Sequence, residues 1–127
     1  MNEEAIGREV LDAAVTLHRE LGPGLLETVY EASLAYELRQ RELTVERQVA
    51  VPFVYKGIEF DEGFRLDLFV NRSVVVEVKS VESLNSAHRK QLLTYLRVTN
   101  IKLGFLLNFG QALMKQGVVR VVNGLQY

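Results

Sequence analysis

The sequence predicts an α/β fold in which one mixed β-sheet is flanked by helices, with the elements in the order αα-βββ-αββ. Three patterns support this prediction. Apolar side chains recur at spacings of three and four through residues 3–42, as they do in amphipathic helices. From residue 43 the spacing changes to every second residue, which is typical of strands. Further on, an apolar run, a helical segment and another apolar run follow one another, which predicts two parallel strands joined by a crossover helix.

Two helices are expected before the strands. Residues 3–20 combine acids in the first turn with an apolar face, and Gly22-Pro23-Gly24 ends this helix. Residues 25–42 have a broad apolar face, with Glu and Arg side chains on the other side. We expect a surface ion-pair network among the charged side chains that follow, namely Arg39, Arg41, Glu42, Glu46 and Arg47.

Three strands in a meander are expected next. Residues 45–55 alternate in polarity, and Pro52 favours a position at the edge of the sheet. Lys56-Gly57 is a turn signal, after which residues 58–70 form a second strand that a bulge can interrupt between its two apolar runs. A short polar turn then leads to the third strand, residues 73–79.

The last elements predict a parallel crossover. Residues 86–98 return to helical spacing with Ser86 as N-cap, and residues 102–108 and 117–122 are apolar runs of strand length. We find no repeat, low-complexity tract or linker. The expectation is therefore a single domain over residues 1–127, an α/β sandwich around one sheet.

Composition excludes several classes of protein. The chain has 127 residues, 48% of them hydrophobic, so a sizeable core is available, and it has no cysteine for disulfides, thiolate-bound metals or a thiol nucleophile. No signal peptide or membrane span is visible, and we expect a soluble, cytoplasmic protein without a membrane partner. The net charge of −1 argues against coating nucleic acid through bulk positive potential, although the basic residues concentrate in the second half.

Two acids stand where the sequence predicts buried strand. Asp67 lies in the apolar segment FRLDLFV, and Glu77 lies in VVVEVKS. Moving an unpaired carboxylate into an apolar site is so costly that the group normally protonates, pairs with a cation or binds a metal. The turn between the two strands can bring the acids close together on one face. Lys79 shares the face of Glu77, because side chains alternate along a strand.

Two explanations fit this cluster. Two carboxylates, a divalent cation and a lysine suit phosphodiester hydrolysis, since the cation neutralises phosphoryl oxygens and lowers the pKa of a bound water, while the lysine orients that water or stabilises developing negative charge. Oxygen ligands without Cys or His nearby favour Mg²⁺ or Mn²⁺ over zinc. The alternative is a partly buried ion-pair network that only supports the sheet, and residue types alone give the two explanations about equal weight.

Four short motifs stand in an informative order along the chain. Residues 24–30, GLLETVY, match the pattern GxxExxY; Asp67 is followed ten residues later by Glu77-Val78-Lys79; and Gln91 and Tyr95 fit the pattern QxxxY. Together these motifs resemble the PD-(D/E)XK nuclease superfamily, within it the GxxExxY protein group, with the QxxxY helix motif of RecB-like nucleases. The resemblance spans about residues 10–122. Leu66 stands where the superfamily name has Pro, a position that supplies no chemical group.

The resemblance implies a restriction-endonuclease-like core and a role for each matching residue. The implied metal ligands are Asp67, Glu77, the backbone carbonyl of Val78 and, directly or through water, Glu27. Lys79 would position or activate the attacking water. Gln91 and Tyr95, four residues apart on one helical face, would flank the site and touch the substrate or support the lysine.

Each of these residues also has a plainer explanation. Any acid at a helix start, as Glu27 is, gains from the helix dipole. Tyr95 is also consistent with a core aromatic that keeps a polar tip. Arg89 and Lys90 precede the QxxxY motif and could meet phosphates, although a charged helix face is usually only solvated.

The leading hypothesis is a metal-dependent nuclease, a hydrolase that cleaves phosphodiester bonds in nucleic acid, DNA more than RNA, with Mg²⁺ or Mn²⁺ as cofactor. The alternative is a non-catalytic nucleic-acid-binding or protein-interaction module that keeps the nuclease fold. A homo-oligomer is compatible with both hypotheses.

Overall fold

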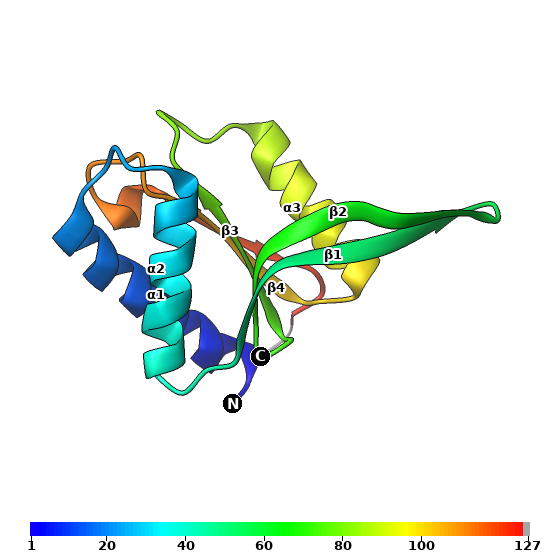
Figure 1. Ribbon diagram of the computed structural model, residues 1–127, viewed down its shortest axis with the longest axis horizontal. Coiled ribbons are helices and arrows are strands. Elements are labelled where there is room, and N and C mark those ends of the chain that lie inside the picture. The colour runs from blue at the N-terminus through cyan, green and yellow to red at the C-terminus, as the bar shows by residue number, and fades with distance from the viewer. Residues whose placement is uncertain (126–127) are drawn as a thin grey trace.

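The computed structural model describes residues 1–125, which form a five-stranded mixed sheet with helices on both faces (Figure 1). The elements in chain order are α1 (Glu3–Leu21), α2 (Glu27–Gln40), β1 (Val45–Tyr55), β2 (Ile58–Val70), β3 (Val74–Lys79), α3 (Ser86–Thr99), β4 (Leu103–Asn108), the 3₁₀ turn η1 (Met114–Gln116) and β5 (Val118–Val122). The sheet order is β1-β2-β3-β4-β5. Strands β3 and β4 are parallel, and the other neighbouring pairs are antiparallel. The predicted α/β class and element order are confirmed, and the architecture is consistent with a restriction-endonuclease-like fold.

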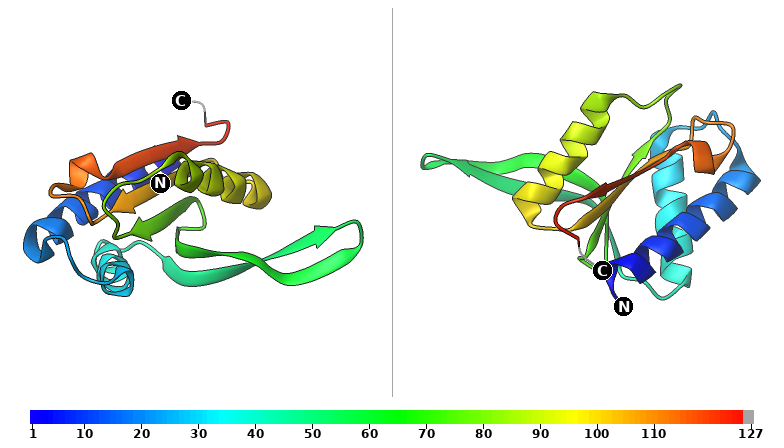
Figure 2. Two further views of the ribbon diagram at one scale, coloured as in Figure 1. Left: turned by 90° about the horizontal axis from the view of Figure 1, so that it is seen from above. Right: turned by 180° about the vertical axis from the view of Figure 1, so that it is seen from behind.

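Each face of the sheet has its own core. Helices α1 and α2 pack on one face, where the buried strand residues include Leu68, Val76 and Val78. Helix α3 packs on the other face (Figure 2). There Leu92 and Leu96 belong to a buried cluster with strand side chains such as Val75 and Leu106. This two-sided burial explains why β3 and β4 read as continuous apolar runs.

Local signals set most of the helix ends. The side chain of Asn2 accepts a hydrogen bond from the backbone N–H of Ala5, and Gly22 ends α1 with φ of 67°. The predicted N-cap of α3 is off by one residue, because Asn85 caps it and Ser86 is the first helical residue. Asn85 and His88 form a reciprocal capping box that ties down this helix start.

Strands β1 and β2 form a hairpin that is much longer than the strands beside it (Figure 1). Its turn is the predicted Lys56-Gly57, where φ is 46° and 84°, the pair of positive values that a type I′ turn requires. The pairing of β1 with β2 shifts between Val51 and Phe53, which confirms a bulge in this region. Strand β1 is an edge strand, as Pro52 indicates. We call residues 53–63, the outer part of the hairpin, the arm.

The hairpin leaves the sheet at a fork between β2 and β3. These strands pair only from Leu68↔Val76 to Val70↔Val74, beside the turn that joins them. From Leu68 back toward its first residue, β2 leads into the arm. From Val76 onward, β3 continues along β4. The next residues on either side of this opening are Asp67 and Glu77.

Candidate active site at the fork of the sheet

Where the fork opens, the side chains of Asp67 and Glu77 take the place of backbone–backbone hydrogen bonds between β2 and β3. The backbone N–H of Asp67 donates to Oε2 of Glu77 at 2.9 Å, and the backbone N–H of Val78 donates to Oδ2 of Asp67 at 2.8 Å. Each carboxylate therefore accepts the amide hydrogen of the opposite strand. The structure brings Asp67 and Glu77 together, as the sequence predicts.

Burial makes the negative charges of this pair costly. Glu77 is 4% exposed, and burial followed by the charge of Asp67 raises its pKa to about 8. Burial also raises the pKa of Asp67, with the charge of Glu31 adding to the rise, while the hydrogen bond from Val78 opposes it. Two acids that resist ionisation beside each other form a site that a cation would stabilise.

Lys79 is the positive charge that acts on both acids from β3. Its ammonium lowers the pKa of Asp67 and of Glu77, although burial outweighs this effect in each case. The residue as a whole is partly exposed. Between Glu77 and Lys79 in the sequence, the side chain of Val78 is buried in the core against α1 and α2.

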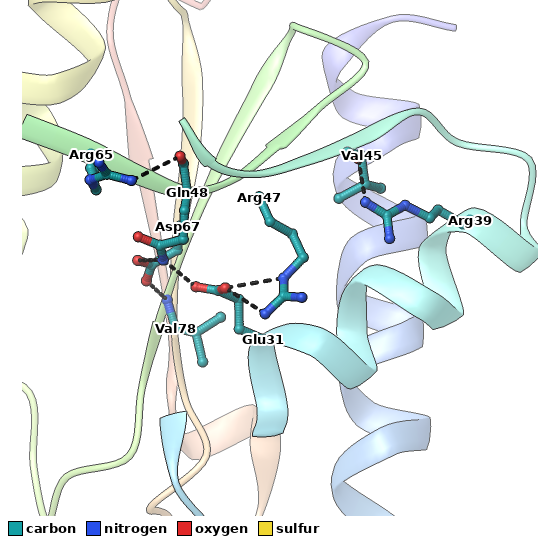
Figure 3. Close-up of polar contacts among 8 residues, drawn as sticks. All are labelled: Glu31, Arg39, Val45, Arg47, Gln48, Arg65, Asp67 and Val78. Atoms are coloured by element: carbon teal, nitrogen blue, oxygen red, sulfur yellow. Dashed lines mark hydrogen bonds and ion pairs between the residues drawn. The ribbon is translucent and has the colours of Figure 1, made fainter. Parts of the chain in front are cut away.

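A third acid, Glu31 of α2, reaches this site, and the sequence did not single it out. Its charge raises the pKa of both Asp67 and Glu77. Glu31 is 5% exposed and forms an ion pair with Arg47 at 3.1 Å (Figure 3). The predicted surface network is therefore wrong for Arg47, whose partner is a buried acid. It is also wrong for Arg41, which pairs with Glu9 and Asp12, and for Glu46, which pairs with Arg72.

Gln48 of β1 joins Glu31 to Asp67. Its side-chain Nε2 donates to Oε1 of Glu31 at 2.7 Å and to Oδ1 of Asp67 at 3.2 Å (Figure 3). The amide dipole thus stands between two carboxylates that would otherwise repel each other. Gln48 has φ of 51°, a left-handed conformation inside a strand, and Arg65 donates to its carbonyl at 3.4 Å. Such strain is a cost of about 1–3 kcal/mol that the contacts around Gln48 must offset.

Glu27 lies at the carboxyl end of β3. Its Oε2 accepts the backbone N–H of Ser80 at 2.9 Å, and the Ser80 hydroxyl donates to the carbonyl of Leu25. These contacts fix the start of α2 to the residue after Lys79. The implied role of Glu27 at the metal stays a prediction.

Tyr30, the last residue of the GxxExxY pattern, has a structural position. Its hydroxyl donates to the carbonyl of Gly22 at 2.5 Å and accepts the backbone N–H of Leu25 at 3.2 Å. Its buried ring stacks on Phe109 with centroids 4.4 Å apart. Tyr30 thereby holds the Gly-Pro-Gly loop that leads to Glu27.

Helix α3 places Tyr95 on the side of the fork and the basic pair elsewhere. Tyr95 stacks on Phe64 of β2 with centroids 4.1 Å apart, and its pKa is raised by burial and then by the charges of Glu77 and Asp67. Gln91, one turn earlier, is exposed. Arg89 donates to the carbonyl of Arg120 at 3.4 Å and, with Lys90, lines a hollow over β5. The structure does not bring Arg89 or Lys90 to the acids, and their substrate-binding role stays a prediction.

The fork suits a hard divalent cation in the chemistry of its donors. All side-chain ligands on offer are carboxylate oxygens, and each carboxylate has about four lone-pair sites, more than its hydrogen bonds occupy. Within residues 1–125, no cluster of three or more His, Cys, Asp or Glu side chains is arranged to hold a metal. Because Mg²⁺ is often bound by only one or two carboxylates, with waters completing its shell, the two acids of the fork fit Mg²⁺.

Comparison with known families agrees with this geometry. The sequence profile of the PD-(D/E)XK nuclease superfamily matches residues 4–121, and the chain belongs to that superfamily. Members typically use divalent metal ions, and a domain of this class implies a nucleic-acid partner. Neither the search of curated proteins nor the search of solved structures found a match. No helix within residues 1–125 is long and apolar enough to cross a membrane.

Proposed function

We propose that this chain is a metal-dependent nuclease that hydrolyses phosphodiester bonds, DNA in preference to RNA, within one nuclease-like domain of residues 1–127. The observation that carries the proposal is the fork, where Asp67 and Glu77 are held together by each other's strands beside Lys79. The pattern of residues 24–30 supports assignment to the GxxExxY group. The absence of cysteine fits action in the cytoplasm.

The proposed mechanism assigns one task to each group. Asp67, Glu77 and the carbonyl of Val78 would hold Mg²⁺ or Mn²⁺, which would supply Lewis acidity toward the phosphate. Lys79 orients the attacking water and stabilises the negative charge that develops on the phosphoryl oxygens. Glu27 of α2 is a further ligand of the ion, directly or through water. Gln91 and Tyr95 contact the substrate from α3. Arg89 and Lys90 hold phosphates further along the strand.

Two carboxylates that carry raised pKa values favour this proposal over a purely structural ion-pair network. The ammonium of Lys79 lowers both pKa values, yet it does not restore an ordinary value to Glu77. Salt-bridged acids normally show depressed pKa values instead. Burial, which no partner cation offsets, therefore raises these pKa values, and ionising both acids creates negative charge that a bound cation would neutralise.

The direct test is cleavage of labelled single-stranded and double-stranded DNA and RNA with Mg²⁺ or Mn²⁺. We expect Asp67→Asn and Lys79→Ala to lose activity at least about a hundredfold. Glu20→Gln, an exposed acid at the end of α1, is the matched control and should stay active. Cleavage that persists in both site variants, or no cleavage by the parent protein, would refute the proposal.

One observation favours the second candidate, a binding module without catalysis. The oxygens of the two acids already accept backbone and amide hydrogens, and residues 1–125 contain no three-ligand cluster. Calorimetric titration with Mg²⁺ separates the candidates. A catalytic site takes up the ion and loses it in Asp67→Asn, whereas a binding module shows no Mg²⁺ uptake while it still retains nucleic acid.

A further inference from the structure

Gln48 of β1 connects two acids that come from different elements of the fold. Its side-chain Nε2 donates to Oε1 of Glu31 in α2, at 2.7 Å, and to Oδ1 of Asp67 in β2, at 3.2 Å (Figure 3). An ionised carboxylate only accepts hydrogen bonds, so an amide oxygen turned toward either acid would be repelled. The two acids therefore fix the direction of the Gln48 amide.

Glu31 is itself held in place, which makes it a fixed partner for this amide. The residue is 5% exposed. Its second carboxylate oxygen, Oε2, accepts from Nε of Arg47 at 3.2 Å and lies 3.1 Å from Nη2 of the same guanidinium. A buried carboxylate with two contacts to one guanidinium has little freedom to rotate, because hydrogen bonds between charged groups are strong and directional. Arg47 thus fixes Glu31, and Glu31 fixes Gln48.

The carboxylate of Asp67 is held from both neighbouring strands. Val78 of β3 donates its backbone N–H to Oδ2 at 2.8 Å, and Gln48 of β1 donates to Oδ1. The last side-chain torsion of an aspartate is broad and roughly two-fold, so a single hydrogen bond leaves the carboxylate able to turn about it. Two donors, one to each oxygen, fix the plane of the carboxylate. The lone pairs that these donors leave free then keep one direction.

The backbone at position 48 is unfavourable for a glutamine. Its φ of 51° lies in the left-handed region, which glycine adopts freely and glutamine rarely does. The hairpin changes face beside this point, since Leu66 and Leu68 of β2 belong to the cores on opposite faces of the sheet. Residues two apart in a strand normally share a face. Because a glycine would allow this change of face without strain, the side chain of Gln48 explains the presence of glutamine here, and the backbone does not.

We propose that Gln48 is a positioning residue of the nuclease site, whose amide holds the Asp67 carboxylate in the orientation that binds the divalent ion, and that Glu31 acts through it by fixing the amide. This inference rests on the proposed function. A ligand that is already oriented loses less freedom when the ion binds. Replacing a group that orients a metal ligand typically changes metal affinity or activity by about ten- to a hundredfold.

The test is calorimetric titration of the full chain with Mg²⁺, beside cleavage assays over a range of Mg²⁺ concentrations. Gln48→Met keeps the length of the side chain and the charge of the site but has no donor, and we expect its dissociation constant for Mg²⁺ to rise about tenfold or more. Cleavage should fall at low Mg²⁺ and recover as the ion approaches saturation, a recovery that a general structural defect would not show. Gln40→Met, exposed at the end of α2, is the matched control and should bind Mg²⁺ as the parent protein does.

A second variant, Gln48→Gly, separates the side chain from the backbone. It relieves the left-handed strain, so a role confined to the change of face predicts Mg²⁺ binding at least as tight as in the parent protein. We expect instead the same weakening as in Gln48→Met, about tenfold or more. Far-UV circular dichroism and urea unfolding check that each variant is folded under the conditions of the titration.

A measurement without metal tests the bridge itself. In ¹H–¹⁵N spectra of the parent protein, the side-chain amide of Gln48, assigned by its loss in Gln48→Met, should exchange with solvent more slowly than that of Gln40. A Gln48 amide that exchanges as fast as that of Gln40, or equal Mg²⁺ affinity in the parent protein and both Gln48 variants, overturns this inference and leaves the proposed function standing. A parent protein that takes up no Mg²⁺ overturns both.

Discussion

Replacing Glu77 by Gln removes the charge from the fork and keeps an oxygen that accepts the Asp67 amide hydrogen. In the parent protein the pKa of Glu77 is raised from 4.5 to about 8, by burial first and then by the charge of Asp67. A raised acid pKa stabilises the fold while the group is protonated. That stabilisation is complete below pH 4.5 and is lost as the pH rises toward 8.

The size of this loss follows from the shift. Each pKa unit corresponds to about 1.4 kcal/mol, so ionising Glu77 lowers the free energy of unfolding by up to roughly 5 kcal/mol. This is a large part of the stability of a typical domain, about 5–15 kcal/mol. The Glu77→Gln variant lacks this loss. Above pH 8 and without metal, we therefore expect the variant to be more stable than the parent protein.

The assay is urea unfolding of both proteins with EDTA at several pH values between about 5 and 9. The quantity of interest is the difference in free energy of unfolding between the two proteins at each pH, because other titrating groups cancel in it. Glu59→Gln, which is exposed on the arm, serves as a control for removal of an acid. If the parent and Glu77→Gln curves run parallel over this range, Glu77 does not titrate with a raised pKa, and the charge argument for a cation site fails.

Three further predictions concern the supports of the fork and of the arm. Gln48→Ala removes the amide between the carboxylates of Glu31 and Asp67 and should lower the free energy of unfolding by about 1–3 kcal/mol at pH 8, measured by urea titration. An unchanged free energy of unfolding would show that this bridge does not stabilise the fold. Tyr30→Phe deletes a hydroxyl that satisfies two backbone groups and should cost about 1–2 kcal/mol, with faster hydrogen exchange in the Gly-Pro-Gly loop, and unchanged exchange there would contradict the role. Gly63→Val puts a side chain against Phe53 and should alter the chemical shifts of the arm but not those of the fork; equal changes at both would mean that the arm is not an independent element.

Much of the architecture could be predicted because local chemistry and burial agree in this chain. The period of apolar residues changes from helical to alternating where α2 gives way to β1, and Gly57 supplies one of the two positive φ values of the hairpin turn. The acids in β2 and β3 stand out against apolar neighbours in the sequence, so Asp67 and Glu77 could be singled out. The fork itself depends on which residues of β2 and β3 pair, and no local sequence pattern predicts that pairing.

Two members of the site escaped prediction for different reasons. Glu31 left a signal, since it shares a helix face with the buried residues Leu34, Ala35 and Leu38 at spacings of three, four and seven. An acid on an apolar stripe is informative in a helix as it is in a strand. Gln48 left none, because its role depends on a left-handed backbone and on the register of β1 against β2.

The hydrogen bonds at the fork decide which explanation of the two acids is the stronger, the metal site or the structural ion-pair network. At Glu77, a carboxamide oxygen could accept the amide hydrogen of Asp67 as a carboxylate does, without the cost of a buried negative charge. A sheet that needed only an acceptor at this position would be more stable with Gln. Asp67 differs, because its two oxygens accept from Gln48 and from Val78, and the amide of Asn would set a donor against one of these donors. The acid at position 77 is therefore a stability cost that structure does not require, and such costs belong to functional sites. The expected signature is that Glu77→Gln stabilises the metal-free protein at pH 8 and abolishes Mg²⁺ binding, whereas a structural network predicts a loss of stability in this variant.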